Sequence, residues 1–596
     1  MPEDQRRIGR EVRYILICMR ARSTRMGVNM EKRIKIAIIG TVAVVIVALA
    51  IVVSYIVEKN TPSKEIKALS EYYQVPEGEA MVIMDDIVYE KNAKLLDGVL
   101  YMDLETITTK FNKRFYWDAI ENILIYTTPT EVIKAEVGAK DYLVNKNKVS
   151  ANYPIVKTVG TEVFAALPFV AEYSDMRYEA YENPDLVVIQ CKWGDYLFAD
   201  VENTTQVRAE ASIKSPILKQ LRKGDRVLLI NNGGNQENGF LTVMTEEGIR
   251  GYVRKKNLSN SYYDKVVSSF ETPVYTNLTK DYKINLTWHQ VTNQEANKKL
   301  SEALETTKGV TTISPTWYRI NSKEGTLSSL ASESYVEKAH SMGIEVWALV
   351  DNFDPNVDTY EVLSRTSSRE RLINELIAEA VKYNLDGINI DFENLTVETG
   401  PHYIQFLREL SVKCRSNQIV LSSDTYVPAS YSKFYDRQEQ GAVIDYVVIM
   451  AYDEHHSKSE EAGSVASIGF LQKAIDDTLL QVPKEKLIMG IPFYSRLWKE
   501  YTELGNKTLT SEAVSMTSAE KTLEANNAAK SWDQTTGQYY AEYEKGGANY
   551  KIWLEEEESI EAKMKLIFEA DLAGVASWRL GFEKTNIWNV IQKYVN

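Results

Sequence analysis

From about residue 278 to the end, the chain alternates strand-length apolar runs with amphipathic stretches of helical length. Strands buried on both faces have near-continuous apolar runs, whereas helices repeat apolar positions every three or four residues. Helices are predicted at about 334–341, 369–383 and 561–570. Eight buried strands joined by crossover helices predict an α/β fold, a (β/α)8 TIM barrel. The strands are expected to begin at Ile284, Val310, Ile344, Leu385, Ile419, Ile444, Leu487 and Gly574.

Polar side chains collect at the C-terminal ends of these runs. Active sites of such barrels are built at that end of the strands, so the sequence predicts a functional site there. The residues concerned are Asp351, Asn352, Asp391, Glu393, Asp424, Tyr452, Asp453, Tyr494 and Trp578.

The segment Asp386-Gly-Ile-Asn-Ile-Asp-Phe-Glu393 carries the strongest chemical signal. Because side chains alternate along a strand, Asn389, Asp391 and Glu393 share one face, and the apolar residues between them share the other. Two carboxylates in a barrel are costly to bury without a function. A structural salt bridge at the strand end is the alternative interpretation.

This segment resembles the D-x-x-D-x-D-x-E signature of glycoside hydrolase family 18, the chitinase and endo-N-acetylglucosaminidase family. Residues 450–453 (Met-Ala-Tyr-Asp), 489–494 (Met-Gly-Ile-Pro-Phe-Tyr) and 577–579 (Ser-Trp-Arg) resemble the family's sixth, seventh and eighth strand motifs. The resemblance covers residues 278–596 and is strongest to the spore-cortex N-acetylglucosaminidase branch. It implies an α+β insertion at about 500–560, between strands seven and eight, that walls the substrate groove.

The resemblance also implies roles for individual residues. Glu393 is expected to be the catalytic acid, Asp391 to hold the acetamido N–H of the substrate, and Tyr452 to bind the acetamido oxygen. The predicted substrate-binding residues are Asn389, Trp578, Tyr494 and Asp453, with Trp578 as the floor beneath the distorted sugar. Family 18 is an exception among glycosidases in that the substrate's acetamido group acts as the nucleophile.

Two positions depart from the common family pattern. Asn389 stands where many members have an aspartate, and strand three ends in Ala-Leu-Val-Asp-Asn-Phe. We expect Asn389 to donate a hydrogen bond to Asp391 without adding a charge. Asp391 should then stay ionised to lower pH than it would beside an aspartate at position 389. The second departure makes chitin a less favoured substrate than peptidoglycan.

Before the barrel, two smaller modules are predicted. The pattern of residues 195–260 predicts short strands with turns at Gly224 and Gly251. This segment resembles bacterial SH3-like domains. Wall binding and a rigid spacer are equally open roles for this module. Residues 58–190 resemble the small domain at the N-terminus of copper amine oxidases, which implies a spacer or binding module and no copper chemistry.

Residues 36–57 form a run of 22 residues without a charge, long enough to cross a bilayer core of ~30 Å as a helix. A membrane anchor is favoured over a cleaved signal because the apolar run continues past Ala48-Leu49-Ala50. Residues 1–35 have a net charge of +6 and the remainder −20. The basic segment is therefore expected to be cytoplasmic and the rest to lie outside, in a single-pass topology.

The remaining composition limits partners and cofactors. Cys18, Cys191 and Cys414 have no metal-ligand or disulfide spacing, and the five histidines form no zinc motif. No cofactor or metal is expected. An acidic outer part argues against a nucleic-acid partner, and no obligate protein partner is evident. The predicted function is retaining, substrate-assisted hydrolysis of N-acetylglucosamine-containing glycan, with chitinase-like hydrolysis or non-catalytic glycan binding as alternatives.

Overall fold

The computed structural model describes residues 4–233, 236–503 and 506–595, and its contacts divide the chain into two compact units. One unit comprises residues 1–96 and 176–269, and the other comprises residues 97–175 and 270–596. Residues 1–3 of the predicted basic segment and Asn596 of the predicted barrel lie outside the described residues.

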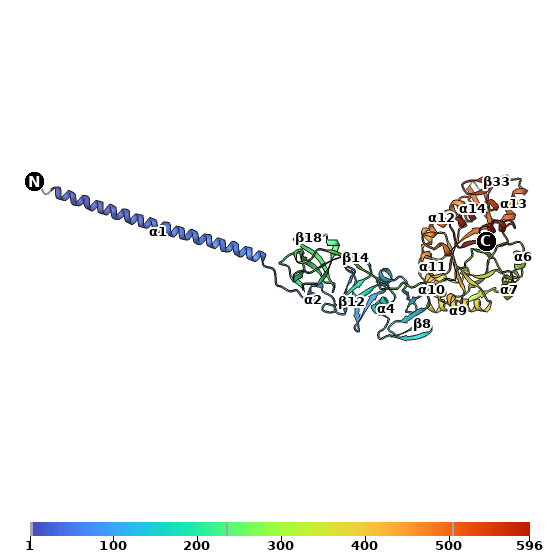
Figure 1. Ribbon diagram of the computed structural model, residues 1–596. Helices are drawn as coiled ribbons and strands as arrows, with labels where there is room; N and C mark the ends of the chain where they lie inside the picture. Colours follow the sequence, from blue (N-terminus) through green and yellow to red (C-terminus); the bar gives the residue numbers. More distant parts are fainter. Residues whose placement is uncertain (1–3, 234–235, 504–505, 596) are drawn as a thin grey trace. The chain divides into compact units, whose positions relative to one another are not determined.

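A closed barrel of eight parallel strands forms the centre of the second unit (Figure 1). The first barrel strand pairs with both the second and the last, so the ring has no free edge. All eight predicted strands are confirmed: β22 (Ile284–His289), β23 (Thr312–Ile320), β25 (Glu345–Asp351), β26 (Gly387–Asp391), β27 (Val420–Tyr426), β28 (Tyr446–Met450), β29 (Leu487–Pro492) and β35 (Gly574–Trp578). A short strand, β24 (Leu327–Ser329), pairs antiparallel with β23 outside the ring.

The alternation of side chains along the strands produces two apolar cores. Ile388 and Ile390 of β26 belong to the larger core, which includes apolar side chains of the surrounding helices. The smaller core contains Trp288, Trp347 and other side chains that the strands turn to the opposite face, inside the barrel. At Gly387, an added Cβ would lie 2.6 Å from Cδ1 of Trp347. The bulky ring therefore requires a glycine at the start of the strand that carries the carboxylates.

Helices follow the strands and confirm the predicted stretches at α7 (Glu333–Ser341), α9 (Thr366–Lys382) and α14 (Glu557–Glu569). Their apolar positions supply the outer core. The other helices of this region are α5 (Gln294–Asn297), α6 (Leu300–Leu304), α8 (Thr359–Leu363), α10 (Gly400–Ser416), α11 (Arg437–Val443), α12 (Ile468–Leu479) and α15 (Ile587–Val595).

The expected insertion between the seventh and eighth strands is present. It is a five-stranded antiparallel sheet with one helix, in the strand order β31-β30-β34-β33-β32. Its elements are β30 (Tyr494–Glu503), β31 (Asn506–Ser515), α13 (Met516–Ala525), β32 (Lys530–Asp533), β33 (Gln538–Lys545) and β34 (Ala548–Leu554).

Residues 97–175 are grouped with the barrel, although the sequence pattern places them in a separate module at 58–190. Their main feature is an antiparallel meander of five strands, which contacts the barrel's helices. Asp118 accepts hydrogen bonds from the backbone N (2.6 Å) and hydroxyl (2.5 Å) of Thr366, the first residue of α9. The elements are β4 (Val99–Asp103), α3 (Leu104–Thr106), β5 (Tyr116–Asp118), β6 (Ile123–Thr127), β7 (Val132–Glu136), β8 (Asp141–Val144), β9 (Asn147–Ser150), β10 (Val156–Val159), β11 (Glu162–Ala166) and α4 (Leu167–Glu172).

The first unit begins with one long helix, α1 (Asp4–Asn60) (Figure 1). Its segment Met30–Asn60 is long and apolar enough to cross a membrane, a property that a signal sequence shares. After α2 (Leu69–Tyr73), the rest of the unit is built from β-strands. These are β1 (Glu79–Met84), β2 (Ile87–Val88), β3 (Ala93–Leu96), β12 (Arg177–Tyr181), β13 (Leu186–Gln190), β14 (Gly194–Asp200), β15 (Thr205–Arg208), β16 (Ile217–Leu221), β17 (Arg226–Leu229), β18 (Gln236–Glu237), β19 (Phe240–Thr245), β20 (Arg250–Arg254) and β21 (Tyr262–Val266).

The strands from β14 to β21 form one antiparallel sheet over the range predicted to be a small β-domain. Val207, Val243 and Val253 are fully buried in the core that this sheet encloses. The alternating apolar pattern of residues 195–260 thus has a direct structural explanation.

Candidate active site

Four carboxyl groups gather where β25, β26 and β27 end. Asp351 of β25 lies in register with Asp391 of β26, and Ile390 lies in register with Ser423 of β27. Asp391 and Asp424 follow this last pair and occupy neighbouring inward positions, where they are 7% and 1% exposed. Glu393 lies two residues beyond the end of β26 and is partly buried. The structure therefore brings the predicted Asp391 and Glu393 together with two further acidic residues.

Glu393 is held by contacts from two neighbouring strand ends. The hydroxyl of Tyr426 donates to Oε2 of Glu393 at 2.8 Å. Asn352 binds the Glu393 backbone in both directions: its Nδ2 donates to the carbonyl at 2.9 Å, and its Oδ1 accepts from the N–H at 3.0 Å. These bonds fix both the position of the residue and one oxygen of its carboxyl group.

The surroundings of Glu393 favour its protonated form. Burial raises the pKa of Glu393, the hydrogen bond from Tyr426 lowers it in part, and the charges of Asp453 and Asp351 raise it further. The net shift is upward from the ordinary value. A carboxyl group that keeps its proton closer to neutral pH can act as a general acid.

Asn389 does not contact the residue that the sequence analysis assigned to it. Its Nδ2 donates to Oδ2 of Asp424 at 2.6 Å, and its Oδ1 accepts from the hydroxyl of Ser422 at 2.6 Å. The expected hydrogen bond to Asp391 is therefore wrong. Inward-facing neighbours along one strand are separated by twice the ~3.3 Å rise, whereas the adjacent strand is only ~4.8 Å away.

That Asp391 stays ionised to lower pH than it would beside an aspartate at position 389 stays a prediction, but its pKa is not low. Burial raises the pKa of Asp391 well above its ordinary value, and the neighbouring Asp424, Glu393 and Asp351 raise it further. An asparagine at position 389 removes one charge from the strand, but Asp424 supplies another from the next strand.

The aromatic residues of the site form one cluster. The ring of Trp288 lies 6.4 Å from that of Tyr452 and 6.0 Å from that of Trp578, centroid to centroid. At Gly490 an added Cβ would lie 3.2 Å from Tyr452 and 3.3 Å from Trp288, so the glycine permits this close packing. Burial, together with nearby carboxylates, raises the pKa of Tyr452 well above its ordinary value. Its hydroxyl thus remains a hydrogen-bond donor.

Tyr494 and Asp453 contact each other directly. The hydroxyl of Tyr494 donates to Oδ1 of Asp453 at 2.6 Å, and Nη2 of Arg496 lies 3.9 Å from the same oxygen. The side chain of Asp453 is 48% exposed. A half-exposed carboxylate that is already oriented can accept hydrogen bonds from a polar ligand.

Sequence reasoning did not assign roles to several residues of the site. Arg319 binds Asp351 with two hydrogen bonds of 2.6 and 2.9 Å, which neutralises that carboxylate. Tyr426 and Asn352 hold Glu393, and Asp424 adjoins Asp391. Asn352 and Asp424 were predicted to lie at the site, without roles, and the same location at the C-terminal end of a barrel strand could have found Tyr426. By contrast, Asp386 binds His340 and the Val346 backbone at the strand start, which agrees with a structural role.

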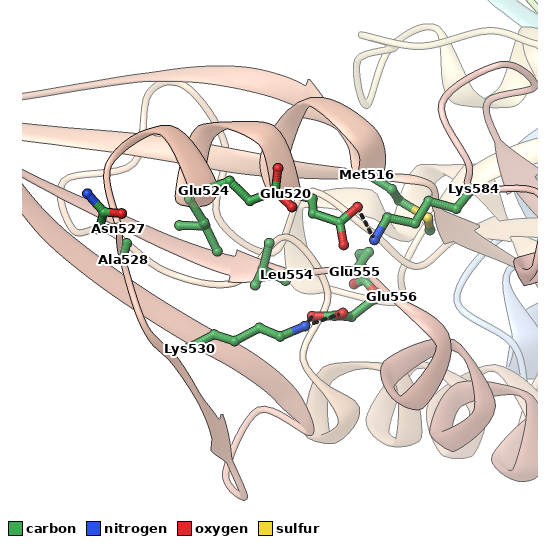
Figure 2. A pocket seen from close by; sticks show the side chains of 11 residues that line it. Met516, Glu520, Glu524, Asn527, Ala528, Lys530, Leu554, Glu555, Glu556 and Lys584 are labelled. Carbon is green, nitrogen blue, oxygen red and sulfur yellow. Dashed lines mark hydrogen bonds and ion pairs between the residues drawn. The ribbon is translucent and has the colours of Figure 1, made fainter.

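A separate hollow of about 470 Å³ lies in the insertion beside α13. Figure 2 shows its charged lining, in which Lys530 pairs with Glu556 at 2.6 Å and Lys584 pairs with Glu520 at 2.7 Å. None of its lining residues belongs to the carboxylate cluster. Its lysines are neutralised by its own glutamates.

The fold and this site define a class of enzyme. A TIM barrel whose strand ends hold a glutamate with a raised pKa, buried aspartates and aromatic rings has the groups that a glycoside hydrolase requires. The chain belongs to the family Glycosyl hydrolases family 18, which matches residues 267–583. It is thus a glycoside hydrolase, and the family resemblance of its strand motifs is confirmed.

The chain is similar to a glycosylase and a cortical fragment-lytic enzyme of Bacillus subtilis. It is 28% identical over 287 residues to the glycosylase YvbX of Bacillus subtilis (strain 168), a match that covers 46% of this chain and 81% of the relative. It is 28% identical over 243 residues to the cortical fragment-lytic enzyme of the same organism, covering 39% of this chain and 56% of the relative.

The chain also aligns with solved structures. The spore cortex-lytic enzyme SleL of Bacillus cereus aligns with a TM-score of 0.48 and 21% identity, covering 53% of this chain and 75% of that one. A chitinase from Chromobacterium violaceum ATCC 12472 aligns with a TM-score of 0.47 and 19% identity, covering 52% and 98%.

Proposed function

We propose that this chain is a membrane-anchored enzyme that cleaves N-acetylglucosamine-containing glycan outside the cytoplasm, with peptidoglycan as its substrate. The observation that carries the proposal is the immobilised Glu393, whose environment favours the protonated form, next to the buried Asp391. A non-catalytic glycan-binding protein would have no need for an acid held in this way. The relationship to cortex-lytic enzymes supports a wall glycan. A chitin-like glycan is the second candidate because the family that the strand motifs resemble includes chitinases.

In the proposed mechanism the substrate supplies its own nucleophile. Glu393 donates its proton to the leaving glycosidic oxygen while the acetamido oxygen attacks the anomeric carbon, which gives net retention after hydrolysis. Asp391 accepts the acetamido N–H, and Tyr452 donates to the acetamido oxygen. Trp578 forms the apolar floor beneath the distorted sugar, and Asp453 with Tyr494 binds its hydroxyl groups.

The modules before the barrel are proposed to place the enzyme on its substrate. The apolar segment of α1 would be the anchor. Residues 195–260 would be an SH3-like domain that contacts the wall or acts as a spacer, and residues 58–190 would be a module like that at the N-terminus of copper amine oxidases. The antiparallel sheet from β14 to β21 supports the assignment of residues 195–260 as an SH3-like domain.

The test compares full-length wild type with Glu393→Gln on purified peptidoglycan and on chitin oligomers, with mass spectrometry of the released fragments. The amide keeps the shape but cannot donate a proton, so hydrolysis should fall by about 10²–10⁴-fold while glycan binding remains. Glu398→Gln, an exposed glutamate nearby, is the matched control and should leave turnover unchanged. Near-normal turnover by Glu393→Gln would show that the acid is another residue.

The same digests distinguish substrate and stereochemistry. Release of N-acetylglucosamine-containing fragments from peptidoglycan but not from chitin would support the wall assignment, and the reverse would favour the second candidate. Proton NMR should show the retained anomer as first product. An inverted first product would rule out the acetamido group as nucleophile.

A further inference from the structure

Asp391 and Asp424 form a pair of buried carboxyl groups on adjacent strands. They follow directly after the paired residues Ile390 and Ser423. In each, Oδ1 is buried with no hydrogen-bond partner within 3.5 Å among the described residues, although the indole of Trp288 is near enough to Asp424 to lower its pKa in part. Within the same part of the chain, no ion pair joins either group to a lysine, arginine or histidine. Asn389 and Ser422 form a chain of hydrogen bonds that ends on the other oxygen of Asp424.

Two such groups cannot both be ionised at low cost. Adjacent carboxylates in a low-dielectric interior repel each other, so the pair binds one proton to unusually high pH and titrates as a unit. Burial raises the pKa of both aspartates, and each responds to negative charge nearby. The other charged or titratable groups around the pair are Glu393, Asp351 with its partner Arg319, Tyr403, Tyr426, Tyr435 and Tyr452.

We propose that Asp424 is a positioning residue that shares one proton with Asp391, and that Asn389 and Ser422 hold it in the orientation this requires. The inference rests on the proposed function of Asp391 and deepens it. An aspartate at position 389 could provide a second carboxyl group on the same strand as Asp391. In this chain Asp424 of the adjacent strand β27 provides it. Asn389 thus takes part in the site without carrying a charge.

The proton stays within the pair during the reaction. When Asp391 accepts the acetamido N–H it must be ionised, and the proton then resides on Asp424, whose hydroxyl faces the ionised Asp391. The pair keeps a single negative charge throughout, and no proton is lost to solvent. The barrel interior therefore need not hold two negative charges beside Glu393.

Titration of the carboxyl groups tests the pairing without reference to activity. In full-length Glu393→Gln, which removes the acid's own titration, infrared difference spectra should show the protonated carboxyl band lost in two separated steps. Adding Asp424→Asn should leave a single step, at a pH below the upper step of the pair, because the second charge is gone. An unchanged upper step would overturn the proposal.

Kinetics test the positioning role. Asp424→Asn should lower kcat/KM by about 10²-fold, the scale of losing one preorganised donor, and change the shape of its pH profile. The double variant Asn389→Asp with Asp424→Asn moves the carboxyl group onto β26 and should recover most of the loss. Asp386→Asn, at the opposite end of the strand, is the control and should leave the profile superimposable on wild type.

These outcomes separate the two proposals. A wild-type enzyme that releases no sugar would refute the proposed function, whereas an active wild type with an unaltered Asp424→Asn profile would refute only the pairing. If Asp424→Asn does not fold, Asp391→Asn in the Glu393→Gln background tests the same pair from its other member. A single step below the upper step of the pair supports the pairing, and an unchanged upper step overturns it.

Discussion

At the scale of single residues, the chemistry depends on how residues at neighbouring strand ends position Glu393 and shift its pKa. Burial and the charges of Asp453 and Asp351 raise the pKa of Glu393, and the hydrogen bond from Tyr426 moderates that shift. Asn352 holds the backbone of the same residue from the other side. Contacts from the ends of β25 and β27 thus fix the position of Glu393. Its pKa reflects burial and nearby negative charge, which raise it, and the hydroxyl of Tyr426, which lowers it.

Replacing Tyr426 by phenylalanine tests this balance. The phenol donates to the carboxyl group and so stabilises its ionised form, and its loss should raise the pKa of Glu393 further. Because Glu393 must be protonated to act, the alkaline limb of kcat/KM against pH should move to higher pH. Tyr431→Phe, at a tyrosine that is 66% exposed, is the control and should not move the limb. An unmoved limb would show that Tyr426 does not act on the acid, and a shift to lower pH would show that it acts in the opposite direction.

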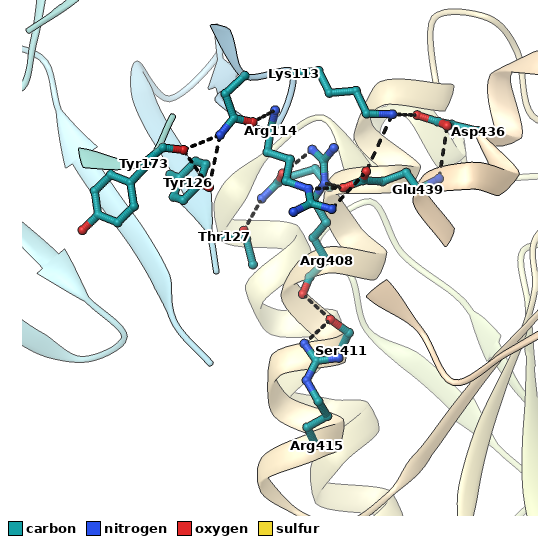
Figure 3. Close-up of polar contacts among 12 residues, drawn as sticks. Lys113, Arg114, Tyr126, Thr127, Tyr173, Arg408, Ser411, Arg415, Asp436 and Glu439 are labelled. Carbon is teal, nitrogen blue, oxygen red and sulfur yellow. Dashed lines mark hydrogen bonds and ion pairs between the residues drawn. The ribbon is translucent and has the colours of Figure 1, made fainter. Parts of the chain in front are cut away.

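At the scale of elements, ion pairs connect the segment that leads into the meander of residues 116–150 with the barrel helices. Figure 3 shows Arg114 of the segment before β5 and Arg408 of α10 converging on Glu439 of α11, at 2.8 and 2.9 Å. Burial alone would raise the pKa of Glu439, but the two arginines outweigh it and lower that pKa to about 2. Because Glu439 and Arg408 are buried, this junction is sensitive to the loss of one partner.

Glu439→Gln should therefore destabilise the barrel unit. Removing one partner of a buried ion pair costs about 3 kcal/mol in the free energy of unfolding. Since the folded pKa is depressed, this contribution is present above the ordinary value of 4.5 and is lost as pH falls through about 2. Chemical denaturation of both proteins across this range should show the difference shrinking in acid.

The matched control for this comparison is Asp477→Asn, which breaks the surface pair between Lys473 and Asp477 of α12. Exposed pairs contribute about 0–1 kcal/mol, so this variant should unfold almost as wild type does. Equal losses in the free energy of unfolding in the two variants would mean that the Glu439 network stabilises the fold no more than a surface ion pair does.

At the scale of the whole molecule, the distribution of charge and apolar residues predicts how the chain lies in a cell. The segment Met30–Asn60 can cross a bilayer by length and composition. The 35 residues at the N-terminus carry a net charge of +6, against −20 for the remainder. Positive flanks remain cytoplasmic, so the catalytic unit is expected outside, where wall glycan is found.

Protease protection tests this orientation. Protease added to intact cells should digest the chain beyond about residue 58, leave a membrane-embedded fragment, and spare a cytoplasmic marker protein. The mass of the chain before digestion also distinguishes an anchor from a cleaved signal. An anchored chain still contains the N-terminal segment, whereas a cleaved chain has lost it. Complete protection until the cells are lysed would overturn the outward orientation.

The sequence by itself determined the features that depend on local periodicity. Continuous apolar runs located all eight barrel strands, and the two-residue alternation of β26 placed Asp391 and Glu393 at its C-terminal end, because successive side chains of a strand must point to opposite faces. Only the tertiary structure decided which residues from different strands meet. The contacts of Asn389 with Asp424, of Tyr426 with Glu393 and of Arg319 with Asp351 depend on the register between parallel strands, which closure of the barrel sets. Register joins residues far apart along the chain, and no local pattern records it.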